Sequence, residues 1–162
     1  MVFSVNNIRV WMISSLIFLA AFNTHADSVT YTLENVILDD STQMTGSFLW
    51  TYDTGNFENG AGQFTSLDIP HTSHDHTDLD ASIDVTQSIE ITLPTSTHDD
   101  GVDIALDLNQ PLTPTTSALI NLVTSKYEIG GNGFHDGLFL SGRISPVTNG
   151  GDMVFKNGFE QE

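Results

Sequence analysis

Cysteine is absent from the 162-residue sequence. Its absence excludes disulfide bridges, thiol nucleophiles and metal centres with cysteine ligands. Apolar packing, backbone hydrogen bonds, or a metal ion held by other ligands must then stabilise any folded domain of this chain. The chain is long enough for one ordinary domain with a core of its own.

Basic residues are also scarce: Lys and Arg together number 4, against 21 Asp and Glu, and the formal net charge is −17. A surface this acidic repels nucleic acid and anionic membranes, and it has too few cations to build a phosphate clamp. We therefore expect neither nucleic acid nor phosphorylated substrates as partners. Solubility outside the cell is our preferred explanation of the acidity, and divalent cation binding is the alternative.

Long apolar runs are missing too, apart from one near the amino terminus. Arg9 precedes an uncharged apolar run over residues 10–22, and a small-residue cleavage site ends at Ala26. The run is shorter than the roughly 20 residues that a membrane-spanning helix needs. It predicts a signal peptide over residues 1–26, a mature chain that begins at Asp27, no membrane span, and a secreted or periplasmic location.

Alternation of apolar and polar residues dominates the rest of the sequence. Val29, Tyr31 and Leu33 alternate with polar residues, and Phe48 and Trp50 belong to a second such set. No stretch after the apolar run has the period of an amphipathic helix. About eight short strands are predicted, separated by Gly, Pro, Asn and Asp, at residues 29–33, 44–52, 64–69, 79–85, 89–93, 102–108, 118–123 and 138–144.

These strands predict an all-β fold, a single antiparallel β-sandwich of jelly-roll type over residues 27–146, with an open barrel as the alternative. Phe48 and Trp50 are expected in its core. Two polar segments, 71–78 and 128–137, interrupt the alternation and are predicted to be flexible, solvent-facing loops. Residues 147–162 are then a linker and a short C-terminal motif.

A cluster of metal-ligating residue types begins in the first of these loops. If the alternation of residues 79–85 extends backwards, several of these side chains project from the solvent-facing side of one strand, with neighbours about 7 Å apart. A His-x-His pair with a carboxylate can bind zinc. A solvated edge strand is the alternative. The candidate ligands are His71, His74, His76, Asp78 and Asp80.

Three acidic turns offer oxygen ligands of the kind that calcium prefers, at residues 39–40, 53 and 99–103. None has the spacing of an EF-hand or of a calcium-binding β-roll, so we interpret them as ordinary Asx turns. A divalent ion, zinc or calcium, is thus the only cofactor that the sequence suggests.

Recognisable catalytic motifs are absent. The patterns G-x-S-x-G and H-E-x-x-H do not occur. With 21 acidic residues, the sequence does not identify the two carboxyl groups that a glycosidase would use. Aromatic side chains can instead stack on sugars, and Phe134, in a glycine-rich loop, is the best placed of them. The sequence therefore favours a non-enzymatic protein and nominates no catalytic residue.

Residues 31–57, with V-I-L-D-D-S, then T, G-S-F, an aromatic residue and Y-D, are similar to a pattern of V-x-F-D-D-G, T, G-S-F, an aromatic residue and Y-D. The pattern resembles the opening of exported bacterial β-rich proteins of the PEP-CTERM-associated type, and residues 106–142 are similar to their second half. Ser41 stands where that group has glycine. A closing D-M-V-F-K-N-G-F-E, similar to the ending of secreted proteins of some gammaproteobacteria, stands in place of the PEP tail. The matching positions are Asp39, Asp40, Gly46, Ser47, Phe48, Tyr52 and Asp53.

The resemblance implies a secreted surface or matrix-associated domain without an established catalytic residue. We therefore expect an exported, non-enzymatic protein whose partner is an extracellular or periplasmic ligand, such as a glycan or a matrix component. The alternative is a metal-dependent hydrolase or a carbohydrate-active protein that uses the histidine and aspartate cluster at residues 71–84.

Overall fold

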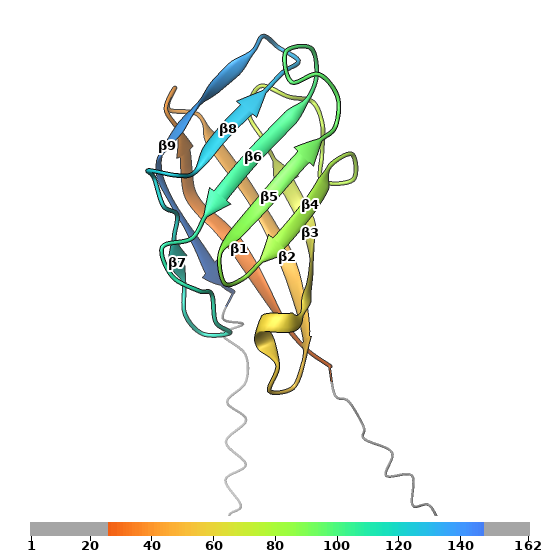
Figure 1. Cartoon of the computed structure of the whole chain (residues 1–162), viewed down its shortest axis with the longest axis vertical. Coiled ribbons are helices and arrows are strands. Elements are labelled where there is room, and N and C mark those ends of the chain that lie inside the picture. The colour runs from red at the N-terminus through yellow and green to blue at the C-terminus, as the bar shows by residue number, and fades with distance from the viewer. Residues whose placement is uncertain (1–25, 148–162) are drawn as a thin grey trace, which may run out of the picture.

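The computed structural model describes residues 26–147, which form an all-β fold (Figure 1). The predicted signal peptide and C-terminal motif lie almost wholly outside the described residues, and both stay predictions. None of the helical structure in the described range is long and apolar enough to cross a membrane. The elements are β1 (Ala26–Leu38), β2 (Gln43–Asp53), the 3-10 turn η1 (Phe57–Asn59), β3 (Ala61–Asp68), β4 (Asp80–Asp84), β5 (Ser88–Leu93), β6 (Val102–Asp107), β7 (Ala118–Leu119), β8 (Lys126–Ile129) and β9 (His135–Pro146).

The strands pair in the order β3-β2-β1-β9-β8-β6-β5-β4, and every pair is antiparallel. Strand β9 holds the two halves together, because its first four residues pair with β8 and its later residues pair with β1. The short β7 pairs with β9. The prediction of an all-β antiparallel fold with about eight short strands is confirmed.

The strand order corrects one detail of the predicted fold. Each neighbouring pair in the sheet is also consecutive along the chain, apart from the pairing of the first strand β1 with the last strand β9 and the place of the short β7, so the described strands form an up-and-down meander without the Greek-key crossovers of a jelly roll. Strands β3 and β4, at the two ends of the order, contact each other without a hydrogen-bonded ladder. The sheet is therefore nearly closed and barrel-like, with β4, β5, β6 and β8 in front of β1, β2 and β3 in Figure 1.

Alternation along β1 and β2 builds much of the core. Tyr31 and Leu33 point inward, and a register shift follows before Val36 and Leu38 point inward again. Asn35 lies in this shift with a φ of 50°, which marks a β-bulge. The bulge shifts the inward and outward alternation of β1, so apolar side chains face the core both before and after it. Opposite it on β2, the buried side chains are Met44, Phe48 and Trp50. The predicted core positions Phe48 and Trp50 are confirmed.

Two strand boundaries were predicted wrongly. Residues 118–123 form only the short β7, because the chain turns back at Asn121, whose carbonyl accepts hydrogen bonds from the amides of Thr124 and Ser125. The segment 128–137 was predicted to be one loop, but it contains the end of β8 and the start of β9. The segment is a tight β-hairpin, in which only residues 130–134 connect the two strands.

Truncation of Phe48 tests this core. Its ring is fully buried, stacks on Tyr31 with ring centres 5.1 Å apart and meets Phe64 edge-on. We expect Phe48→Ala to lower the free energy of unfolding by about 3–5 kcal/mol, measured by chemical denaturation. The control is Leu49→Ala at the next, outward-facing position, which should change it by less than about 0.5 kcal/mol. Equal effects of the two variants would contradict the observed inward and outward faces of β2.

Candidate functional site

Four connections gather at one end of the sheet, which we call the loop end: the turn 39–42 and the loops 70–79, 94–101 and 130–134. They follow β1, β3, β5 and β8, respectively. In an antiparallel meander alternate connections fall at the same end, which is the upper end in Figure 1. Segments far apart in the sequence thereby come within contact distance of one another.

The loop 130–134 packs against two of the other loops through its backbone. The Gly130 amide donates to the Gly101 carbonyl at 2.8 Å, and the Asn132 amide donates to the His71 carbonyl at 3.3 Å. A Cβ atom at Gly130 would lie 2.3 Å from the Thr97 carbonyl oxygen, so only glycine permits this approach. Gly130 is thus packed against the neighbouring loops, whereas residues 131–134 face solvent, as predicted.

Three side chains from three segments of the loop end lie close together: Asp40, His71 and His135. Each offers one ligand atom, and these atoms all lie within 4.8 Å of one another. His71 Nε2 lies 2.6 Å from Asp40 Oδ2, and the rings of His71 and His135 stack with centres 3.7 Å apart and an interplanar angle of 11°. Both rings are half-buried, whereas Asp40 is exposed.

Local hydrogen bonds fix the Asp40 carboxylate. Its Oδ1 accepts the Thr42 hydroxyl at 2.6 Å and the Thr42 amide at 2.9 Å, which is the geometry of an Asx turn. These bonds, with a smaller contribution from His71, lower the pKa of Asp40 to about 2. Asp40 is therefore ionised at neutral pH, and the prediction of an ordinary Asx turn is correct for this residue.

The structure separates the five ligands predicted from the sequence. Residues 70–79 are a loop, because Pro70, a left-handed His71 (φ 69°) and an Asx turn at Asp75 interrupt the strand pattern. The expected shared strand face therefore does not exist. His71 joins Asp40 and His135. His76 lines a separate hollow beside β3 with Phe64 and Leu79, and Asp80 belongs to β4, opposite Thr92.

His74 and Asp78, the other two predicted ligands, contact each other and a third loop. His74 Nδ1 lies 3.6 Å from Asp78 Oδ2, and His74 Nε2 lies 3.1 Å from Asp100 Oδ2. Nε2 is buried, and the carboxylate of Asp100 is the charged group that contacts it. Burial alone would lower the pKa of His74, but Asp100 and Asp78 outweigh it and the pKa is raised.

Removing the charge of Asp100 tests this contact between two loops. We expect Asp100→Asn to lower the pKa of His74, as measured by NMR titration of its ring, because one of two stabilising anions is lost. Because the pKa of His74 is raised in the folded protein, the contact contributes its full stabilisation of the fold below about pH 6.5. This contribution is lost as the pH rises through the pKa of His74 in the folded protein. Asp99→Asn, one residue away, serves as the control and should leave the His74 titration unchanged.

Sequence reasoning missed Asp40, His135 and Asp100 as neighbours of the histidine loop. Asp40 was assigned only to an acidic turn, and His135 only to a glycine-rich loop. The useful signal was strand order, because a meander places the connections after the first, third, fifth and seventh full strands at one end. That order was not available once the segment 128–137 had been assigned entirely to a loop.

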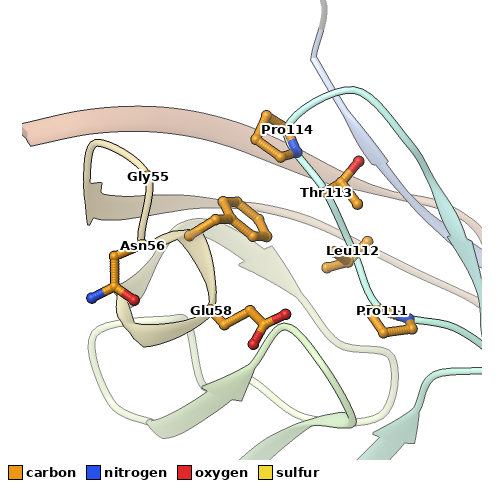
Figure 2. Close-up of a pocket in the computed structure, with 8 residues that line it drawn as sticks. Gly55, Asn56, Glu58, Pro111, Leu112, Thr113 and Pro114 are labelled. Carbon is orange, nitrogen blue, oxygen red and sulfur yellow. The ribbon is translucent and has the colours of Figure 1, made fainter.

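The opposite end of the sheet carries a second depression, an open hollow of about 500 Å³ (Figure 2). Pro111, Leu112, Thr113 and Pro114 form one wall, and Gly55, Asn56 and Glu58 lie across from them. Phe57 also lines the hollow, where it meets the edge of Tyr52. This end contains none of the histidines in the described part of the chain, so it differs chemically from the loop end.

No protein-family model, curated protein or solved structure matches this chain. Its function must therefore be inferred from the geometry and chemistry of its own residues.

Proposed function

We propose that the mature chain is an exported, non-enzymatic binding domain that recognises an extracellular or periplasmic ligand with its loop end. The observation that carries this proposal is the packing of the four loops on one another in a fixed arrangement. A surface that is ordered before its ligand arrives loses little conformational entropy on binding. Exposed loops held by a rigid sheet are also a common location for binding residues.

The side chains at the loop end favour a hydroxyl-rich or cationic ligand. Phe134 is 39 % exposed and stacks on the exposed His98, with ring centres 4.2 Å apart and an interplanar angle of 4°. Such a flat aromatic surface suits the face of a sugar ring. Asp99 and Asp100 lie exposed in the same loop as His98 and can accept hydrogen bonds from hydroxyl groups. An anionic ligand would be repelled, and of the two remaining classes the flat aromatic surface favours neutral glycans of a matrix.

Sedimentation of the purified mature protein with extracellular matrix from the producing organism tests the proposal. We expect the wild-type protein to pellet with the matrix and Phe134→Ser to pellet markedly less, because its ring is the stacking surface. Pellet formation should also fall after periodate oxidation of the matrix glycans but persist after protease treatment of the matrix. Thermal melts should show that Phe134→Ser remains folded, since the side chain lies outside the core.

The matched control is Leu140→Ser. Leu140 is 54 % exposed on β9 and, with the exposed Leu138 on the same strand, forms an apolar surface away from Phe134. We expect this variant to pellet like the wild type. Loss of binding in Leu140→Ser but not in Phe134→Ser would show that the ligand binds at β9 and not at the loop end. A wild-type protein that does not pellet would refute the proposal.

A metal-dependent hydrolase is the second candidate function, and Asp40, His71 and His135 favour it. Three protein ligands leave a fourth position of a tetrahedral site open, which is how catalytic zinc holds a reactive water. The purified protein supplied with zinc should be assayed on model esters and phosphoesters. Turnover that is lost in Asp40→Asn would favour this candidate over the non-enzymatic one.

Export is a separate prediction, which follows from the apolar run at residues 10–22. Fractionation of producing cells should find a processed form in the periplasm or medium, and amino-terminal sequencing should place its start at or near Asp27. Replacing two leucines of the run, Leu16 and Leu19, with Arg should block processing and retain the full-length chain. Cytoplasmic full-length protein as the sole form of the wild type would contradict export.

A further inference from the structure

The residues Asp40, His71 and His135 combine two imidazole nitrogens and one carboxylate oxygen, all within 4.8 Å of one another. We propose that the loop end binds one divalent transition metal ion of the zinc class through these three side chains. The inference rests on the proposed function and names part of what the loop end binds. Figure 1 shows the three segments that carry these residues meeting at the upper end of the sheet.

The donor atoms select the class of metal. Two imidazoles and a carboxylate suit zinc, copper or nickel, whereas calcium takes six to eight oxygen ligands and magnesium retains most of its water. A net charge of −17 further raises the local concentration of cations around the protein. Since the chain has no cysteine, thiolate ligation cannot compete for a soft metal.

The Asp40 carboxylate is already oriented for ligation. Thr42 occupies Oδ1 with two hydrogen bonds, so Oδ2 is the oxygen that faces His71. An outer residue that fixes a ligand in this way is typical of metal centres, because it removes the freedom that the ligand would lose on binding.

The two imidazoles lie side by side next to the carboxylate. The ring centres of His71 and His135 are 3.7 Å apart, and His71 contacts Asp40. A bound metal ion takes neutral imidazole nitrogens as ligands and would supply a positive charge next to this carboxylate.

The remaining histidines of the described chain lack this arrangement. His74 has only carboxylates as ionisable contacts, His98 stacks on Phe134, and His76 lines a hollow without a second histidine. One metal ion per chain is therefore expected. Because Asp40 and the two rings are only partly covered, a water or a ligand oxygen can complete the coordination from solvent.

Isothermal titration of the mature protein with Zn²⁺ tests the inference. We expect one ion per wild-type chain, and Asp40→Asn and His135→Gln should each weaken binding by at least about tenfold, because loss of even an outer-shell partner costs 10–100-fold. Asp40→Asn keeps the acceptor for Thr42, so the turn should stay folded. Circular dichroism melts confirm folding, and the visible spectrum of Co²⁺-loaded protein reports nitrogen and oxygen ligation without relying on activity.

His76→Ala and His74→Ala are the matched controls, because each removes a histidine of the same loop that lies outside the proposed ligand set. Both should bind Zn²⁺ like the wild type, and excess Ca²⁺ should not compete. No stoichiometric zinc in the wild type would overturn the inference. Wild-type affinity in both Asp40→Asn and His135→Gln, or loss of binding in a folded His76→Ala, would also overturn it.

The inference and the proposed function can fail separately. Zinc titration uses the isolated protein, whereas matrix sedimentation uses the natural ligand. Zinc binding without sedimentation would retain the metal site and refute the proposed function. Sedimentation that is unchanged in a chelator, together with no zinc in the titration, would retain the proposed function and refute the metal site.

Discussion

Strand β9 is the constraint on which the rest of the structure depends. Its first residues pair with β8 and its later residues with β1, so one strand joins the two halves of the meander. Gly137 is part of this arrangement, because a Cβ there would lie 2.2 Å from Asp39 Oδ2. Tyr127 on β8 donates a hydrogen bond to Asp39, and burial and this carboxylate raise the pKa of the phenol, which keeps it a donor. Strand pairing thereby brings the turn 39–42 to the start of β9, where His135 lies.

The chemistry of the loop end follows from that placement. His135 begins β9, and Asp40 follows β1. His71 lies in the loop 70–79, and its carbonyl accepts a hydrogen bond from the backbone of the loop 130–134. Without cysteine, side-chain contacts and a shared metal ion can add to the backbone hydrogen bonds that connect these loops. His74 and Asp100 provide the first, and we propose that Asp40, His71 and His135 provide the second. In the proposed function, the same loops form the surface that binds the external ligand, with Phe134 and His98 beside it.

Much of the fold could be predicted from the sequence because its strands alternate so regularly. Phe48 and Trp50 were placed in the core by period alone, and the Asx turn at Asp40 is a local feature of an Asp-x-Thr motif. Strand β8 was missed because it is four residues long and runs directly into glycines. The jelly-roll topology was wrong because alternation determines which face a residue occupies but not which strand lies beside it.

The candidate site was predicted only in part for a related reason. His71 was named as a candidate ligand, but the strand assumed for residues 74–80 does not form, since Asp75 accepts hydrogen bonds from Thr77 and starts a turn. Its true neighbours, Asp40 and His135, are contributed by long-range pairing of β1, β8 and β9, which single-sequence periodicity does not report. Side chains that are distant in sequence become a site through topology alone.

X-ray diffraction from crystals of zinc-soaked mature protein, recorded on both sides of the zinc absorption edge, tests the central claim most directly. The account predicts one anomalous peak at the loop end, about 2.0–2.2 Å from a nitrogen of His71, a nitrogen of His135 and an oxygen of Asp40. A peak at His74 or His76 instead, or loops that do not bring these three residues together, would contradict it.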